Sequence, residues 1–234
     1  MTLVVDDRLN RAQIMDIAAD SAPKVPSSVY QSVKQMILSG TYRPGNKLTH
    51  EDLARSLNVS RTPVREACER LHQEGYLRHV RNRGYFVSEI DESEALNLYG
   101  VREALEIYAL DLTFSTVGKV DTAPLREIGL RYEKAIANHA AKTRLQVDAE
   151  FHLALAAQAG NAHLVQMMAS IFERISLKMR TETYQLRLGE DAILEHAQLM
   201  DTLDSGDPVA ASRMLKSHIS SARNRLLQQI RQWV

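Results

Sequence analysis

The chain has 234 residues, and its 29 Lys and Arg balance its 29 Asp and Glu, so the formal net charge at pH 7 is zero. One cysteine, Cys68, excludes an intramolecular disulfide and favours a reducing compartment, from which we expect a cytoplasmic protein. The sequence has no apolar run near the roughly 20 residues that span a bilayer, so we expect no membrane partner.

Residues 1–27 are expected to form an N-terminal extension, to which we assign no role. Leu9, Ile14 and Ile17 indicate at most one brief helix, and the run APKVP at residues 22–26 predicts an extended linker. A helical stripe then begins at Val29 and is broken at residues 39–40, where Ser and Gly follow one another.

A helix-turn-helix pattern covers residues 49–75. Thr49 and Asp52 have the spacing of a capping box, which predicts the start of a short helix that ends near Asn58. A second helix follows after a tight turn, and the buried stripe of that helix is predicted to be Val64, Ala67, Cys68 and Leu71. Helices at this spacing are typical of DNA-binding domains.

The second helix of this pair also has a basic face. Arg61 and Arg65 lie one turn apart near its start, where the helix dipole and the free N–H groups favour a phosphate. Arginine can also bind the O6/N7 edge of guanine. The alternative is an ordinary amphipathic surface helix.

Two short β-type runs, at residues 77–80 and 85–87, flank the turn-prone stretch RNRG at residues 81–84. Three helices and this hairpin predict a winged helix-turn-helix. The arginines at the tip favour a phosphate or minor-groove contact, and a plain structural turn is the alternative. Residues 28–90 hold 10 Lys and Arg against 6 Asp and Glu, whereas residues 91–234 hold 16 against 19. The basic excess therefore coincides with the DNA-binding pattern.

From Asp91 onward the pattern is helical throughout. Asp91 or Ser93 opens the first helix, and Gly118, Gly160, Gly189 and the pair at residues 207–208 predict later breaks. Six helices without a strand pattern predict an all-α bundle. The expected fold is therefore mainly α, with a winged helix-turn-helix domain at residues 28–90 and a six-helix bundle at residues 91–234.

Four residues of the bundle are of metal-ligand type. Asp148 and His152 stand four residues apart and project from one helix face, while His196 and His218 fall within the fifth and sixth bundle helices. One carboxylate and three imidazoles can bind zinc, nickel or manganese and leave positions for water or an anion. The alternative is four ordinary surface or core residues.

The run ILSGTYRPGNKLTHEDLARSLNVSRTPVREACERLHQEGYLRHVRNRGYFV resembles the N-terminal domain of GntR-family bacterial transcription regulators. The resemblance assigns DNA contacts to the start of the recognition helix and to the wing tip, at Ser60, Arg61, Thr62, Pro63, Arg65, Arg83 and Gly84. Some relatives have a basic residue where this chain has Glu51, so the resemblance predicts the loss of one phosphate contact.

The runs VREALEIYAL, DAEFHLALAAQAGNAHL and EHAQLMDTLDSGDPVAASRMLKSHI resemble the FCD ligand-binding domain of the FadR subfamily. Six bundle helices are similar to its VanR-like branch. The resemblance places the metal ligands of that family on Asp148, His152, His196 and His218. It implies one divalent transition metal, zinc before nickel or manganese, and a small carboxylate effector. Arg102 matches an arginine that could bind this carboxylate, and an ion pair with Glu106 is its alternative role.

These patterns predict an effector-responsive transcription regulator, a homodimer that represses from a double-stranded DNA operator. The helical domain, residues 91–234, would bind the effector and form the dimer. No catalytic residue is expected, because no motif supplies a base or nucleophile beside the metal. Two alternatives remain open: a metal-dependent enzyme with an appended DNA-binding domain, and a regulator whose metal is purely structural.

Overall fold

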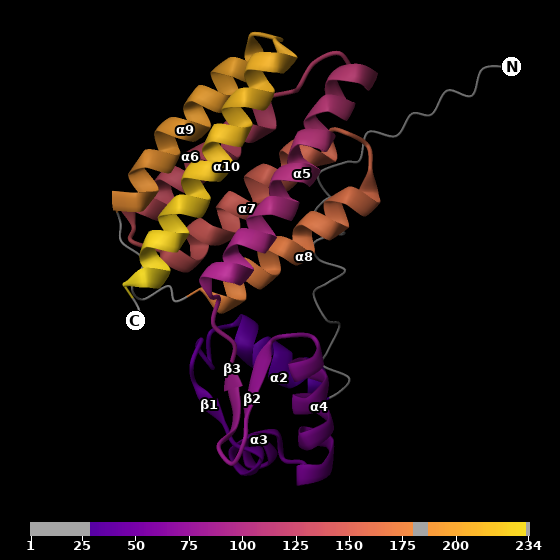
Figure 1. Ribbon diagram of the computed structural model, residues 1–234, viewed down its shortest axis with the longest axis vertical. Helices are drawn as coiled ribbons and strands as arrows, with labels where there is room; N and C mark the ends of the chain where they lie inside the picture. Colours follow the sequence, from indigo (N-terminus) through magenta and orange to yellow (C-terminus); the bar gives the residue numbers. More distant parts are fainter. Residues whose placement is uncertain (1–28, 180–186, 233–234) are drawn as a thin grey trace, which may run out of the picture.

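The computed structural model describes residues 29–179 and 187–232, so the expected N-terminal extension lies outside the described residues. A small winged region lies at one end of the molecule and a bundle of long helices at the other (Figure 1). The elements of the winged region are α2 (Val29–Leu38), β1 (Lys47–Leu48), α3 (His50–Leu57), α4 (Arg61–Gln73), β2 (Leu77–Val80) and β3 (Gly84–Val87). The elements of the bundle are α5 (Glu92–Thr116), α6 (Ala123–Ala137), α7 (Ala141–Ala157), α8 (Ala162–Lys178), α9 (Arg187–Asp204) and α10 (Pro208–Arg231).

Local sequence signals determine the helix-turn-helix. The Thr49 hydroxyl accepts a hydrogen bond from the backbone N–H of Asp52 at 3.1 Å, which is the contact that a capping box predicts. Asn58 ends α3 in the left-handed conformation, with φ of 53°, a conformation that asparagine tolerates better than most residues. The chain can therefore turn sharply and start α4 at Arg61.

The wing is a three-stranded antiparallel sheet in the order β1-β3-β2. Val80 pairs with Gly84 at the hairpin end, and Gly84 has a φ of 91° that a side chain would oppose. The strand β1 was not predicted from the sequence, because two residues are too few to show a period. It pairs Lys47 with Phe86 and so joins the segment before α3 to the wing.

The winged region has its own hydrophobic core. Val64, Cys68 and Leu71 of the predicted α4 stripe belong to this core together with residues from α2, α3 and the sheet, and Ala67 is also buried. One member of this core, Leu177, belongs to α8 of the bundle. The backbone N–H of Ile90 also donates to the carbonyl of Lys178 at 3.2 Å. The end of α8 is therefore packed against the DNA-binding region.

The described part of the bundle contains six helices, as the sequence predicted, and the mainly α fold is confirmed. Asp91, Asn161 and Asp207 each accept a backbone hydrogen bond at a helix start. The predicted break at Gly189 is wrong, because α9 begins at Arg187 and runs through that glycine. Glycine in a helix interior costs about 1 kcal/mol relative to alanine, which a long packed helix can absorb near its first turn. None of the described helices has the length and hydropathy that crossing a membrane requires.

Candidate functional site

The start of α4 presents its polar residues to solvent. Ser60 precedes the helix without a side-chain cap, so its hydroxyl does not occupy the first backbone N–H groups. Thr62, Arg61 and Arg65 are exposed, and Pro63 is half-buried in the first turn. The helix end that would meet DNA is thus unobstructed, with two arginines beside it.

Glu51 acts on one of these arginines. Its carboxylate lies 3.4 Å from the Arg61 guanidinium and 3.7 Å from that of Arg55, and all three side chains are well exposed. Glu51 therefore places a negative charge next to α4. This charge opposes phosphate binding at that point.

The wing tip carries the remaining two predicted DNA contacts. Arg83 is exposed and its guanidinium lies 5.6 Å from the centre of the Phe86 ring, whereas Gly84 is half-buried at the start of β3. The ring contact orients Arg83 without neutralising its charge.

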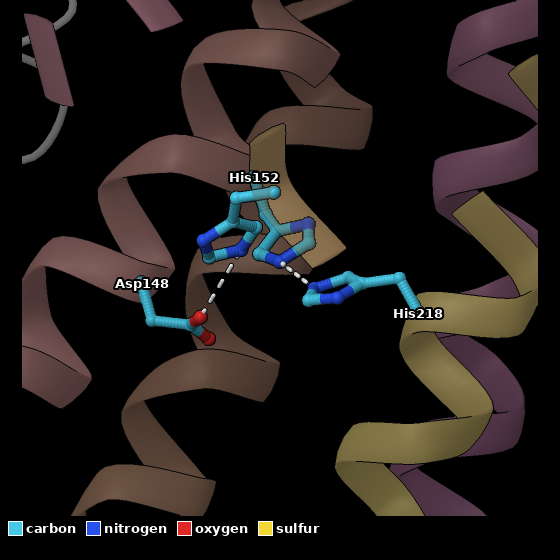
Figure 2. A group of neighbouring side chains, drawn as sticks. Asp148, His152 and His218 are labelled. Atoms are coloured by element: carbon cyan, nitrogen blue, oxygen red, sulfur yellow. Dashed lines mark hydrogen bonds and ion pairs between the residues drawn. The ribbon is translucent and has the colours of Figure 1, made fainter. Parts of the chain in front are cut away.

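The bundle brings together the four predicted metal ligands. Asp148 and His152 come from α7, His196 from α9 and His218 from α10, and one ligand atom from each lies within 4.8 Å of all the others. The labelled side chains of Asp148, His152 and His218 point toward one another between the helices (Figure 2). The three histidines are buried, and Asp148 is partly exposed.

Two arginine–glutamate–histidine relays orient this cluster, and the first is buried whereas the second is partly buried. In the first, Arg102 Nε donates to Glu106 at 2.6 Å, and the other carboxylate oxygen of Glu106 lies 2.7 Å from His152 Nδ1. The two residues of the ion pair are one helical turn apart on α5. The ion pair with Glu106 that was the alternative role of Arg102 is therefore present.

The second relay is formed by residues of α9 and α10. Arg225 donates two hydrogen bonds to Glu195, at 2.6 and 2.7 Å, and Glu195 lies 2.8 Å from His218 Nδ1. Glu195 is on α9, whereas Arg225 and His218 are on α10. A carboxylate behind a ligating histidine is the usual way in which proteins fix the ring of a metal ligand.

The pKa values indicate which atoms hold protons. Burial raises the pKa of Glu106, but the charge of a protonated His152 and the charge of Arg102 outweigh burial and lower the pKa to about 2. Burial also opposes the hydrogen bonds from Arg225 and His218, which lower the pKa of Glu195 to about 2. Both carboxylates are therefore ionised and can only accept hydrogen bonds.

An ionised carboxylate requires a proton on the histidine nitrogen that faces it. In the neutral rings, the Nδ1 atoms of His152 and His218 then donate to Glu106 and Glu195, and the Nε2 atoms bear lone pairs. These two Nε2 atoms lie 3.1 Å apart. Two lone pairs at this distance repel each other unless a cation lies near both.

His196 completes the test of whether a metal fits. Neither of its ring nitrogens has a hydrogen-bond partner in the part of the chain that the structure describes, although Nε2 lies 3.5 Å from Asp148. Burial, followed by the charges of His218 and His152, lowers its pKa well below the usual value. A buried, neutral imidazole without a partner is costly, and it is the form that binds a metal. The residues therefore fit a divalent metal.

A small, partly enclosed pocket lies beside the cluster. Asp148 and Arg102 line it, together with two arginines that the sequence analysis did not single out, Arg144 and Arg225. The Nη2 atom of Arg102 is buried and has no hydrogen-bond partner among residues 29–179 and 187–232. Arg144 could have been noticed from the sequence, because it stands four residues before Asp148 on α7.

Comparisons with known proteins agree with this arrangement. Residues 26–87 match the model of the bacterial regulatory proteins of the gntR family, and residues 97–221 match the FCD domain. The Nta operon transcriptional regulator of Aminobacter aminovorans is 30% identical over 196 residues, 84% of this chain and 91% of that protein. The HTH-type transcriptional repressor GlaR of Escherichia coli (strain K12) is 24% identical, over 81% of this chain and 90% of that relative.

A solved GntR transcriptional regulator from Rhodococcus sp. RHA1 has the same fold. It is 24% identical with a TM-score of 0.70, over 86% of this chain and 96% of the other. The chain belongs to the GntR family and combines its winged helix-turn-helix with an FCD domain. It is a DNA-binding transcription regulator, and its relatives are regulators rather than enzymes. The enzyme alternative is therefore not favoured.

Proposed function

We propose that the protein is a cytoplasmic repressor that a small organic acid releases from its operator by binding at a metal in the helical domain. The observation that carries this proposal is the buried cluster of one carboxylate and three imidazoles within 4.8 Å, next to a pocket lined by arginines. A metal in this cluster and the buried Arg102 together attract a carboxylate. One relative, GlaR, is named a repressor.

The metal would be held by Asp148, His152, His196 and His218. Mixed imidazole and carboxylate ligands suit zinc first, with nickel or manganese as alternatives. When bound, the metal supplies a positive charge and an open coordination position. The chain itself contributes Arg102, whose Nη2 atom lacks a partner among the described residues and which lines the same pocket.

Helix α8 supports a connection between this site and the DNA-binding domain. The Phe172 ring stacks on His152 with 5.7 Å between ring centroids, and the Arg102 guanidinium lies 4.6 Å from the centre of the same ring. The next residue, Glu173, accepts a hydrogen bond from the Tyr76 hydroxyl at 2.6 Å. Adjacent residues of one helix thus contact the effector site and the winged region.

The release mechanism is a shift between two arrangements of the winged regions. An effector that displaces Phe172 favours an arrangement in which the two recognition helices no longer match their half-sites. In this proposal, residues 28–90 bind DNA, and residues 91–234 bind the effector and form the dimer. The predicted base and phosphate contacts are Ser60, Arg61, Thr62, Pro63, Arg65, Arg83 and Gly84.

A homodimer on a short, nearly palindromic operator follows from the few contacts that one winged helix makes. Val101 and Tyr108 are exposed on the same side of α5, at 48% and 56%, and Met167 of the neighbouring α8 is 55% exposed. Apolar surface of this kind suits an interface between two copies. Sedimentation should show a dimer at micromolar concentration, and a monomer both free and on DNA would contradict this assignment.

The experiment that tests the proposal uses the full chain and an operator selected from random duplex DNA by the protein itself. Metal content is measured first, and small carboxylic acids are then screened for thermal stabilisation and for release of the labelled operator. We expect about one metal per chain and at least one acid that both stabilises and releases. A stoichiometric metal with no releasing acid would favour the purely structural metal instead.

A further inference from the structure

We propose that His50 takes up a proton when the winged region binds DNA, so that its ring becomes a third cation beside Arg61 and Arg65. The affinity for DNA then rises as the pH falls. His50 is the first residue of α3, and α3 packs against the recognition helix α4, on which both arginines lie. Proton uptake at this position depends on neither the metal nor the effector.

A cluster of titratable rings connects α3 to the wing. The rings of His50, His79 and His72 surround that of Tyr85, at centroid distances of 5.6, 4.9 and 6.1 Å. The Tyr85 hydroxyl donates to Glu69 of α4 at 2.7 Å, which holds the central ring in place. These residues come from α3, α4, β2 and β3, so the cluster lies where the helix-turn-helix meets the wing. None of the DNA contacts expected from the sequence involves these histidines.

The charges around His50 are mostly positive. The charged and titratable groups that act on its ring are Arg65 and Arg61 of α4 and His79 of β2. Glu51, the next residue along the chain, pairs with Arg61 at 3.4 Å, and none of the described carboxylates forms an ion pair with His50. A proton on this ring would therefore add a positive charge next to two others.

The unbound protein disfavours that charge. Burial lowers the pKa of the His50 side chain, and the positive charges of Arg65 and Arg61 lower it further. Within the described winged region, Nε2 of His50 is the one buried side-chain nitrogen or oxygen without a hydrogen-bond partner. The ring is therefore neutral near pH 7 when no DNA is bound.

DNA binding offsets the charges that oppose protonation. Phosphates that meet Arg61 and Arg65 neutralise part of their charge, and a phosphate also attracts a protonated imidazole. The pKa of His50 is therefore higher in the complex than in the unbound protein. A group whose pKa rises on binding takes up a proton, so the added affinity is present at low pH. It is lost as the pH rises through the pKa of the complex.

The first test measures the affinity of the full-length protein for its selected operator by fluorescence anisotropy, at constant ionic strength. We expect binding about three- to ten-fold tighter at about pH 5.5 than at about pH 8, because the ordinary pKa of histidine, about 6.5, lies between these limits. His50→Gln should lose most of this rise. His50→Lys carries a permanent charge and should bind tightly at both limits.

His163→Gln, at an exposed position of α8 in the bundle, is the matched control and should keep the full rise. A melting curve shows that each variant is folded. The metal ligands are unchanged in every variant, so any effect of acid on them is common to all. If the unchanged protein shows no rise, or if His50→Gln keeps it, the proposal is overturned. Loss of the rise in His79→Gln but not in His50→Gln would place the proton on the neighbouring ring and would overturn it as well.

Calorimetry counts the protons directly. The enthalpy of operator binding is measured at about pH 6.5, where histidine titrates, in phosphate and in Bis-Tris. These buffers differ in their heat of ionisation, so the difference between the two enthalpies gives the number of protons taken up. We expect a fraction of a proton per chain for the unchanged protein and clearly less for His50→Gln. No uptake by the unchanged protein, or equal uptake by the two proteins, would contradict the role of His50.

Discussion

The Nε2 atoms of His152 and His218 lie 3.1 Å apart, with the two rings stacked at 5.1 Å between centroids. The Nδ1 atom of each ring lies within hydrogen-bond distance of a different glutamate: Glu106 on α5 for His152, and Glu195 on α9 for His218. The geometry of the candidate metal cluster therefore depends on two carboxylates that are not among its four ligand-type residues. Residues of this kind tune metal affinity by fixing the proton and the orientation of the ligand.

Glu195→Gln should lower metal affinity about 10- to 100-fold, because the amide no longer holds the Nδ1 proton of His218 as a carboxylate does. Competition with a chromophoric zinc chelator measures this affinity, and a melting curve shows that the variant is folded. Glu190→Gln, at an exposed position of the same helix, is the control and should keep the affinity of the unchanged protein. Equal zinc affinities for Glu195→Gln and Glu190→Gln would mean that the second relay does not support a metal ligand.

Arg65→Ala should weaken specific operator binding by about 1–3 kcal/mol and leave the fold intact, because we expect the exposed arginine to contact a base or phosphate in the major groove. Fluorescence anisotropy on the selected operator measures the loss, and the affinity should also fall steeply with added salt. Arg213→Ala removes the same charge from the bundle and serves as the control. If Arg65→Ala has the same operator affinity as the unchanged protein, Arg65 does not contact the operator.

Glu51→Gln should tighten DNA binding by about two- to five-fold, because it removes an exposed carboxylate that lies 3.4 Å from Arg61. The gain should be similar on operator and on random DNA, since phosphates and not bases are involved. Glu133→Gln, an exposed change on α6, controls for the altered net charge. Tighter binding by both variants to the same extent would show that the position of Glu51 is irrelevant.

Tyr76→Phe should reduce the effector response by about two- to ten-fold, because it removes the hydrogen bond that joins the winged region to Glu173 of α8. Effector and metal affinities should remain, and the measured quantity is the ratio of operator affinities without and with effector. Tyr30→Phe is a close control, since the Tyr30 hydroxyl donates to Glu74 within the winged region itself. The same loss of response in both variants would contradict a specific role for the Tyr76 contact.

The sequence predicted the local parts of the fold well, because their causes are local. The Thr49 cap and the stripe from Val64 to Leu71 follow from neighbouring residues, and the structure forms both. The predicted break at Gly189 is wrong, because tertiary packing along α9 outweighs the weak helix preference of one glycine. The strand β1 was missed, because its partner Phe86 lies 39 positions further along the chain from Lys47.

The candidate site was predictable only in part. Spacing along one helix connects Asp148 to His152, but only the resemblance to a family connected them to His196 and His218 on other helices. Glu195 was missed, because periodicity gives the face of a helix but not what packs against it. Arg144 was missed although it stands four residues before Asp148 on α7. The contact between Tyr76 and Glu173 joins residues 97 positions apart, and no local pattern points to it.

The central claim is tested most directly by two measurements on the same samples, metal content and effector-induced operator release. Both are made on the unchanged protein and on His196→Ala. His196 has no hydrogen-bond partner among the described residues, so its removal breaks no hydrogen bond, although it also removes the ring contacts with Phe151 and Tyr132. We expect His196→Ala to lose most of its metal and its response to the acid while still binding the operator, because the winged region supplies all the described residues of its core except Leu177. Equal metal content and equal release in the two proteins would contradict the metal-centred account.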